Sequence, residues 1–321
     1  MRSHIAGICG DCEVTGAKNI LVIRLGALGD ILLCMKPFQD IRAAHKDAKV
    51  TLLTMPAFAG LARQMPWFDA VIEDNRPSWW QWDEWKKLYT AVRSRNFDCV
   101  IDLQNKPRSR FYKPFFFDKN VQWSSTAGNS TFPPTTFPLK IHRQQELLVQ
   151  LRNAGIGDSG PLNLDWLAAP ITDLNLPKRY VVFIPGCSPH LLHKRWPPAH
   201  YAKLAKTFAD MGCGVVVVGT KADAASIAAI KEEASFIIDV SGQTSFAQLA
   251  SLVRKAEGVV GNDTGPTFLA AMVGAPTLTL MSHHTDPVRS GPVGPRCAWL
   301  KENTIADISV EAVQREMAKL I

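Results

Sequence analysis

A carboxylate follows a glycine turn near the start of the chain, in the segment RLGALGDI at residues 24–31. The run before it, NILVIRL at 19–25, is apolar and typical of a strand, and Gly26 and Gly29 allow a sharp turn into a helix. Asp30 would then lie at the carboxyl end of a buried strand, where α/β proteins place their chemistry. Its side chain can cap the helix or, ionised at neutral pH, act as a general base.

A second strand-to-helix turn lies in the segment GNDTGP at residues 261–266. An Ala-rich helix follows it, and either Thr264 or Asp263 could cap that helix. The start of a helix offers free N–H groups and a partial positive charge, which bind phosphate oxygens. Asn262, Asp263, Thr264 and Gly265 are therefore candidate phosphate-binding residues, although an ordinary capped turn explains the same pattern.

A third loop brings cations to the carboxyl end of another strand, in the segment PGCSPHLLHKRWPP at 185–198. Lys194 and Arg195 can neutralise a diphosphate, Arg through its bidentate fork, and Ser188 adds a hydroxyl. A solvated basic turn is the alternative. Two loops suited to phosphate on one sheet edge favour a site for a phosphorylated ligand.

Several other chemistries lack their motifs in this chain. It contains no P-loop, no H-E-x-x-H, no G-x-S-x-G and no G-x-G-x-x-G. It also has no Asp-x-Asp pair, so a metal ion clamping a nucleotide diphosphate has no evident ligands. We expect neither a metal nor a cofactor. Cys9 and Cys12 form one C-x-x-C pair without a second, and we assign them to an extension without chemistry.

Two aromatic and basic clusters in the first half have no motif. Trp79, Trp80, Trp82 and Trp85 are close in sequence, and we expect core packing in preference to a membrane-surface belt. The second cluster, at 104–117, mixes Phe and Tyr with cations and contains no acid. It could form a surface that binds an anionic acceptor, or it could be a basic helix with buried aromatic residues. The candidate acceptor-binding residues there are Arg108, Arg110 and Lys113.

Strand-like apolar runs alternate with helix-length segments along the chain, which predicts parallel, doubly wound sheets. The alternation pauses between about 105 and 140, and a break at 167–179 marks the boundary between two Rossmann-like domains. Their carboxyl strand ends would face a central cleft. The predicted strands are 19–25, 49–55, 69–74, 98–104, 180–186, 214–220, 236–242, 258–263 and 275–281.

Size and composition bound the class of protein. The chain has 321 residues, 46% of them hydrophobic, which suffices for two domains. No apolar run reaches the length of a membrane span and no secretory signal is evident, so we expect a cytoplasmic protein. The net charge of +7 is spread along the chain, which argues against nucleic-acid binding.

Taken in order, these pieces resemble the bacterial lipopolysaccharide heptosyltransferases of glycosyltransferase family 9, which transfer heptose from ADP-heptose to the inner core. The resemblance runs from Asn19 to the C-terminus. It rests on ILVIRLGALGDILLCMKP, FDCVIDLQNKPRS, KRWP, the long stretch DVSGQTSFAQLASLVRKAEGVVGNDTGPTFLAAMVGAPT, and TDP at 285–287.

The resemblance implies a GT-B fold and an inverting, metal-independent transfer. It assigns residues 1–17 to an extension, 18–172 to an acceptor-binding domain and 173–321 to a domain for the nucleotide sugar. The implied partners are that donor and an anionic, lipid-linked glycan, which suggests peripheral contact with the cytoplasmic face of the inner membrane.

Residue by residue, the resemblance makes Asp30 the catalytic base and Lys194 the donor-phosphate lysine. Asp263, Thr264 and Gly265 match the donor-binding turn, and Ser188, Arg195, Thr220 and Asn262 complete the predicted donor site.

Two departures concern the donor. Phe268 stands where the family usually has His, so that contact is lost or supplied by a group such as His283 or His284. Lys221, after Thr220, stands where related enzymes often carry an acid near the ribose. These departures keep two alternatives open: a catalytically altered nucleotide-sugar-binding protein, or a sugar-nucleotide epimerase or hydrolase on the same scaffold.

Overall fold

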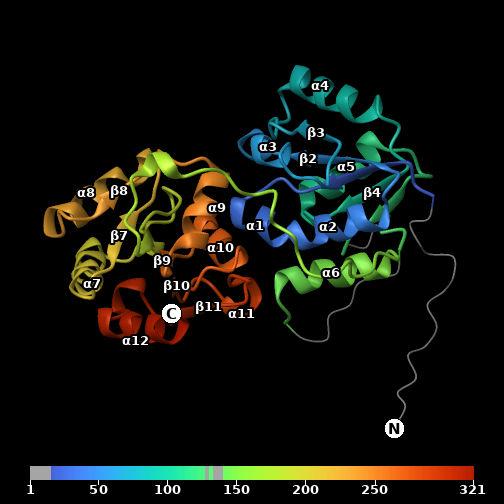
Figure 1. Ribbon diagram of the computed structural model, residues 1–321. Helices are drawn as coiled ribbons and strands as arrows, with labels where there is room; N and C mark the ends of the chain where they lie inside the picture. Colours follow the sequence, from blue (N-terminus) through green and yellow to red (C-terminus); the bar gives the residue numbers. More distant parts are fainter. Residues whose placement is uncertain (1–15, 127–129, 133–139) are drawn as a thin grey trace, which may run out of the picture. The chain divides into compact units, whose positions relative to one another are not determined.

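The computed structural model describes residues 16–126, 130–132 and 140–321 (Figure 1). The chain divides into two compact units, Met1–Leu162 and Asn163–Ile321, and each is described by itself. Cys9 and Cys12 lie outside the described residues, so the assignment of that pair stays a prediction.

Unit 1 is built on a five-stranded parallel sheet with the strand order β3-β2-β1-β4-β5. The chain runs outward from β1 to β3 and then crosses back to β4, so the order reverses between β1 and β4. Such a switch point leaves a crevice outside the carboxyl ends of the two strands. The strands are β1 Asn19–Ile23, β2 Lys49–Thr54, β3 Ala70–Glu73, β4 Cys99–Asp102 and β5 Gln122–Ser124.

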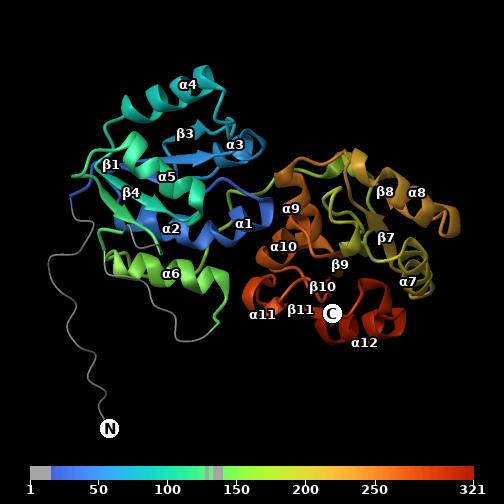
Figure 2. The same ribbon diagram turned by 180° about the vertical axis from the view of Figure 1, so that it is seen from behind.

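Helices cover both faces of this sheet, with α4 on one side and α2 and α6 on the other (Figures 1 and 2). Alternate residues of β1 point to opposite faces, and Leu21 and Ile23 join the core formed with Leu88 of α4 and Tyr112 of α5. The helices are α1 Leu28–Leu33, α2 Met35–Ala44, α3 Pro56–Ala62, α4 Trp82–Arg93, α5 Pro107–Phe116 and α6 Arg143–Asn153.

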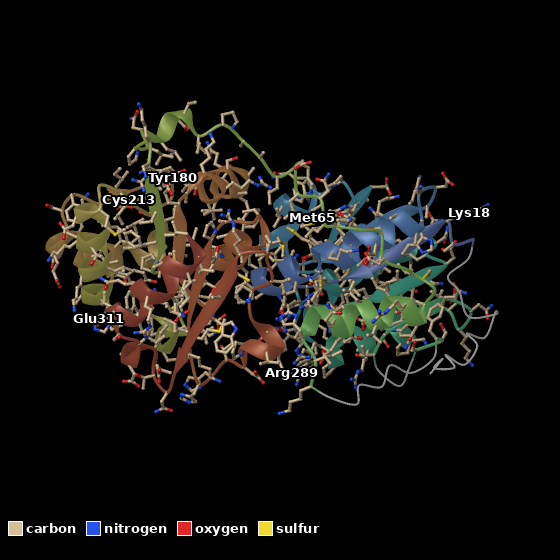
Figure 3. The ribbon with its side chains drawn as sticks, turned by 60° about the horizontal axis from the view of Figure 1, so that its bottom comes forward. Lys18, Met65, Tyr180, Cys213, Arg289 and Glu311 are labelled. Atoms are coloured by element: carbon tan, nitrogen blue, oxygen red, sulfur yellow. The ribbon has the colours of Figure 1, made fainter. Side chains whose placement is uncertain are left out.

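Unit 2 contains a six-stranded parallel sheet with the order β11-β10-β9-β6-β7-β8. Its order reverses between β6 and β9. Tyr180 and Cys213, labelled in Figure 3, lie at the amino edge of this sheet, because Tyr180 opens β6 and pairs with Gly214 of β7. The strands are β6 Tyr180–Ile184, β7 Gly214–Val217, β8 Ile238–Asp239, β9 Gly258–Asn262, β10 Thr277–Ser282 and β11 Cys297–Glu302.

The main core of unit 2 centres on buried aromatic residues that include Phe183, Trp196 and Tyr201. The Trp196 indole donates to the carbonyl oxygen of Ile308 at 2.9 Å, which fixes the chain just before α7. The helices are α7 Pro198–Asp210, α8 Ala224–Glu233, α9 Phe246–Lys255, α10 Gly265–Met272, α11 Pro287–Ser290 and α12 Val310–Leu320, with the 3₁₀ turns η1 Thr172–Leu174, η2 Leu192–Lys194, η3 Lys221–Asp223 and η4 Ile305–Asp307.

All nine predicted strands are present, although the one at 236–242 shortens to the two residues of β8. The predicted pause at 105–140 is wrong in part, because α5 and β5 continue the alternation there. Two prolines at 107 and 114 hid the helix, since one opens it and the other lies inside it. The edge strand β11 was also missed, and its pattern is mostly exposed.

The expectation that the tryptophans pack in the core is wrong for Trp79, Trp80 and Trp82, which are exposed. They lie in the loop before α4 and on its first residue, beyond the face that Leu88 and Val92 bury. Of the four, Trp85 alone packs inward, against the rings of α5.

Candidate functional site

The turn after β1 places Asp30 in the first turn of α1. Gly26 has a φ of 137°, a conformation that residues with a side chain rarely adopt, and an added Cβ would lie 2.2 Å from the Phe58 ring. Ala27 precedes the helix, and the Asp30 Oδ2 accepts a hydrogen bond from its N–H at 3.1 Å. Asp30 is therefore the third helical residue and not the N-cap, although its side chain still caps the helix start through this bond. Gly29 lies within α1, so only Gly26 makes the turn.

Arg24 holds the Asp30 carboxylate. Its Nη2 lies 2.8 Å from Asp30 Oδ1, and its Nη1 donates to the carbonyl oxygen of Leu103 at 2.5 Å. The Arg24 side chain is 10% exposed, whereas that of Asp30 is 48% exposed. A buried guanidinium anchored to the next strand therefore orients a carboxylate that a ligand can reach.

A pocket of about 190 Å³ opens at the switch point of unit 1 and includes Asp30. Its wall brings together residues that follow β1, β4 and β5 with residues of α6. Two cations of this wall, Lys106 and Arg143, suit an anionic ligand, and Arg143 also pairs with Glu146 of the same wall at 3.3 Å. The lining residues are Arg24, Asp30, Leu33, Leu103, Gln104, Asn105, Lys106, Thr126, Arg143, Glu146 and Leu147.

Asp102, at the end of β4, supports the loop that forms this wall. Its Oδ1 accepts hydrogen bonds from the N–H groups of Gln104 and Asn105 at 3.0 and 2.9 Å. The Gln104 side chain in turn accepts from the N–H of Leu25 at 3.0 Å, which ties the two loops together. Burial raises the pKa of Asp102 to about 6, against the opposing effects of these N–H groups and of Arg24.

The predicted acceptor residues on α5 do not line this pocket. Arg108 pairs with the buried Asp74 at 3.2 Å and stacks over Trp85, 5.2 Å from the ring centroid. Lys113 lies over the Trp123 ring at 5.8 Å, and Arg110 is exposed. Lys106, which precedes the first residue of α5, is the cation that this segment contributes to the pocket.

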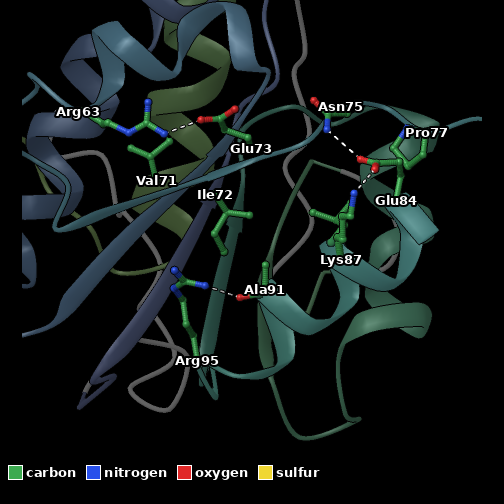
Figure 4. Close-up of a pocket in the computed structure, with 11 residues that line it drawn as sticks. Arg63, Val71, Ile72, Glu73, Asn75, Pro77, Glu84, Lys87, Ala91 and Arg95 are labelled. Atoms are coloured by element: carbon green, nitrogen blue, oxygen red, sulfur yellow. Dashed lines mark hydrogen bonds and ion pairs between the residues drawn. The ribbon is translucent and has the colours of Figure 1, made fainter. Parts of the chain in front are cut away.

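Another pocket of unit 1 lies between β3 and α4 and contains none of the predicted site residues (Figure 4). Its charges are satisfied within the protein. Arg63 pairs with Glu73, Lys87 pairs with Glu84, and the Arg95 guanidinium donates to the carbonyl oxygen of Ala91 at 2.5 Å. We therefore assign no substrate to it.

In unit 2, the loops after β6 and β9 flank the switch point and meet through Lys194 and Asp263. The Lys194 Nζ lies 2.5 Å from Asp263 Oδ2, which also accepts a hydrogen bond from the Thr285 hydroxyl at 2.6 Å. Asp263 is thus held by Lys194 and Thr285. The alternative that Asp263 caps α10 is wrong. Thr264 precedes α10, but its hydroxyl makes no capping bond to the helix N–H groups.

Asn262 links the same two loops through buried hydrogen bonds. Its side-chain oxygen accepts from the N–H of Trp196 at 3.2 Å and from the Tyr201 hydroxyl at 3.1 Å. Its amide nitrogen donates to the carbonyl oxygen of Pro185 at 2.7 Å. Because the side chain is fully buried, Asn262 positions the loops that would meet a donor.

Asp223, which was not predicted as a site residue, organises two of the predicted donor-site residues, Arg195 and Thr220. Arg195 lies 3.2 Å from its Oδ1, and both the N–H and the hydroxyl of Thr220 donate to its Oδ2, at 2.9 and 2.8 Å. A Cβ added at Gly186 would lie 2.6 Å from the Asp223 carboxyl group, which explains the glycine there. Ser188 and Lys221 are exposed on the surrounding loops.

Histidines lie beside Lys194. The rings of His193 and His284 are 4.4 Å apart, whereas the Nδ1 of His283 lies 2.5 Å from the carbonyl oxygen of Asn303. Partial desolvation, followed by the nearby His283, His193 and Lys194, lowers the pKa of His284. Phe268, at the position where the resembled family has His, is buried in the core.

Within the described ranges, no group of three or more His, Cys, Asp or Glu side chains could hold a metal ion. In the same part of the chain, no helix combines the length and apolar character needed to cross a bilayer.

Two parallel α/β units, each with polar loops at its switch point, are typical of the GT-B fold, and comparisons with known structures agree. A heptosyltransferase II from E. coli matches with a TM-score of 0.71 at 21% identity, covering 94% of this chain and 98% of that one. The E. coli heptosyltransferase WaaC with ADP matches with a TM-score of 0.77 at 19% identity, covering 94% and 100%.

Sequence comparison gives the family. Glycosyltransferase family 9 (heptosyltransferase) matches residues 85–318, so the chain belongs to that family and is a glycosyltransferase. The lipopolysaccharide heptosyltransferase 1 of Pseudomonas aeruginosa is 25% identical over 300 residues, covering 86% of this chain and 81% of its own length.

Proposed function

We propose that this enzyme transfers heptose from ADP-heptose to a lipopolysaccharide core glycan, with inversion at the anomeric carbon and without a metal ion. One observation supports the proposal: Asp30, Lys194 and Asp263, predicted for catalysis and for donor binding, follow β1, β6 and β9, strands that flank the switch points of the two sheets. The relatives named as lipopolysaccharide heptosyltransferases support the choice of sugar and acceptor.

In this mechanism, Asp30 removes the proton from the acceptor hydroxyl as its oxygen attacks the anomeric carbon of the donor. The new glycosidic bond forms as the bond to the diphosphate breaks, and the leaving ADP takes the electron pair. General-base assistance of this kind typically supplies about 10²–10⁴-fold in rate. Arg24 orients the carboxylate, because its guanidinium contacts both Asp30 and the carbonyl oxygen of Leu103.

Lys194 and the start of α10 would stabilise the negative charge that develops on the departing diphosphate. The Lys194 ammonium carries three donors, of which Asp263 uses one. His284 is placed to add a further contact, since its ring touches that of His193 on the same loop as Lys194. His284 would thereby replace the contact that Phe268 cannot make.

The acceptor would enter the pocket around Asp30, with Lys106 and Arg143 recognising its anionic groups. This assignment moves acceptor recognition from the middle of α5, where Arg108, Arg110 and Lys113 lie, to the start of that helix and to α6. A lipid-linked core glycan has the anionic character that such a wall favours.

Transfer assays with ADP-heptose and a core acceptor test the function. We expect a product of inverted anomeric configuration by NMR, turnover that persists in EDTA, and thermal stabilisation by ADP in preference to UDP or GDP. Donor incubated alone should be consumed slowly. Rapid acceptor-independent consumption would instead identify an epimerase or hydrolase, and binding of ADP-heptose without turnover would identify an altered binding protein.

A further inference from the structure

An exposed aromatic surface covers the outer side of α4 and α5 in unit 1. Trp79 is 75% exposed, Trp80 60%, Trp82 73% and Phe111 50%. Water-soluble proteins rarely leave large aromatic side chains in one contiguous exposed patch without a function. We define the aromatic surface as Trp79, Trp80, Trp82, Tyr89, Phe111 and Phe115.

Ring contacts join the α4 and α5 parts of this surface, and Trp79 contacts Trp80 within the loop before α4. Trp85 lies 5.7 Å from Phe111 and 5.5 Å from Phe115, and Tyr89 lies 5.8 Å from Phe115. The Trp85 indole also donates to the carbonyl oxygen of Ser78 at 3.1 Å, which ties the tryptophan loop to α4. The exposed rings are therefore presented by a fixed support.

Exposed cations lie near the rings, in residues 76–87 and 106–117. Arg108 and Lys87 are engaged by Asp74 and Glu84, which leaves Arg76, Lys86, Lys106 and Arg110 exposed in these two segments against the exposed Asp83. Lys86 lies four residues after Trp82 and three before Tyr89, and therefore on the same face of α4. Arg110 is exposed beside Phe111, while Glu84 is engaged by Lys87 and Asn75.

We propose that the aromatic surface docks on an anionic phospholipid bilayer. Trp side chains favour the interface between head groups and hydrocarbon, and nearby Lys and Arg are attracted to anionic head groups. The surface lies on the outside of helices and combines rings with a local excess of cations, which matches a charged lipid interface. Docking is peripheral: the rings enter the interfacial layer and no segment crosses it.

The position of this surface serves the proposed function, on which this part of the inference rests. Lys106 lines the Asp30 pocket and directly precedes α5, whereas Phe111 and Phe115 belong to the aromatic surface. At about 1.5 Å per residue, the ten residues of α5 span roughly 15 Å. Docking would therefore bring the pocket close to the head groups from which a lipid-linked acceptor projects.

Vesicle flotation with the full chain tests the docking. The wild type should float with phosphatidylcholine vesicles that contain phosphatidylglycerol, weakly with pure phosphatidylcholine, and less at high salt. The triple variant Trp79→Ser, Trp80→Ser, Trp82→Ser should lose partitioning by about ten-fold or more. Trp299→Ser, which removes an exposed tryptophan on β11 of unit 2, should float like the wild type.

Two results would overturn the proposal: a folded wild type that stays with the aqueous phase, or a triple variant that floats like the wild type. Light scattering tests a third. If the wild type self-associates without floating, and the triple variant does not self-associate, the aromatic surface is a protein interface.

Activity separates this inference from the proposed function. The triple variant should turn over a delipidated, water-soluble acceptor at the wild-type rate and lose rate only on an acceptor embedded in vesicles. Turnover without flotation contradicts the docking alone, and flotation without any heptosyl transfer contradicts the function alone.

Discussion

The guanidinium of Arg24 lies 2.8 Å from the carboxylate of Asp30, and its other arm donates to the Leu103 carbonyl oxygen beyond the end of β4. One buried cation thus links the loops on both sides of the switch point in unit 1. The pair makes Arg24 a positioning residue for the proposed base.

Arg24→Lys should therefore lower kcat about 10–100-fold and leave the KM for the donor nearly unchanged, because a single ammonium cannot hold both partners in the same geometry. Steady-state kinetics with both substrates measure this split. Arg63→Lys, which alters a surface pair in the other pocket of unit 1, is the control and should behave like the wild type. Equal kinetics for both variants would exclude a positioning role for Arg24.

The turn at Gly26 should tolerate no side chain. Gly26→Ala must adopt a φ of 137° and place its Cβ 2.2 Å from the Phe58 ring, so we expect a loss of unfolding free energy on the order of 2–4 kcal/mol. Gly60→Ala is a matched control in α3, where an added Cβ meets no atom within 4 Å, and it should be neutral or stabilising. Chemical denaturation measures both variants, and similar midpoints would refute the strain argument.

Lys194 should matter for both the donor and the fold of its loop. Lys194→Ala removes a charge-assisted contact to the diphosphate, worth about 1.5–3 kcal/mol, so the Kd for ADP should rise roughly 10–100-fold by calorimetry. It also leaves Asp263 with only the Thr285 hydroxyl of its two side-chain partners, which should lower the Tm. Lys203→Ala, which breaks an exposed pair with Glu311, should change neither quantity. Unchanged ADP affinity in Lys194→Ala would remove this residue from the donor site.

Asp102 should give folding stability a distinctive pH dependence. Its pKa is raised from 3.8 to about 6, so the carboxyl stays protonated in the folded chain while it ionises in the unfolded chain. Raising the pH from about 4 to about 6 therefore disfavours folding, by an amount on the order of 3 kcal/mol. Asp102→Asn keeps an acceptor for the N–H groups of Gln104 and Asn105 and cannot titrate.

The stability difference between Asp102→Asn and the wild type should thus move in favour of the variant as the pH rises from about 4 to 6. Urea unfolding at several pH values measures it. Asp47→Asn, at an exposed turn, controls for loss of a surface charge. Parallel stability profiles for Asp102→Asn and the wild type would mean that burial does not raise the pKa of Asp102.

Much of the candidate site could be predicted from local sequence, because the site residues lie directly after strands. Apolar runs located the ends of β1, β6 and β9, and Asp30, Lys194 and Asp263 follow those ends within a few residues or one loop. The same logic found the predicted strands, whose buried residues leave a clear apolar signal.

Other parts of the site depend on contacts between distant segments, which no local pattern encodes. Arg24 acquires its role from Leu103, and Asp263 is held by Thr285 from the loop after β10. Arg143 reaches the pocket from α6. The prediction that the tryptophans are buried failed for a related reason. Composition predicts burial, but the direction of each ring depends on how α4 packs against α5.

The Asp30→Asn variant tests the central claim most directly. Its amide side chain keeps one acceptor oxygen, which can serve the Ala27 N–H, but Arg24 loses its charged partner, so the Tm should fall modestly while the Kd for ADP stays near the wild-type value. The account predicts that kcat for heptosyl transfer falls about 10²–10⁴-fold. A folded Asp30→Asn enzyme that transfers heptose within a few-fold of the wild-type rate would contradict it.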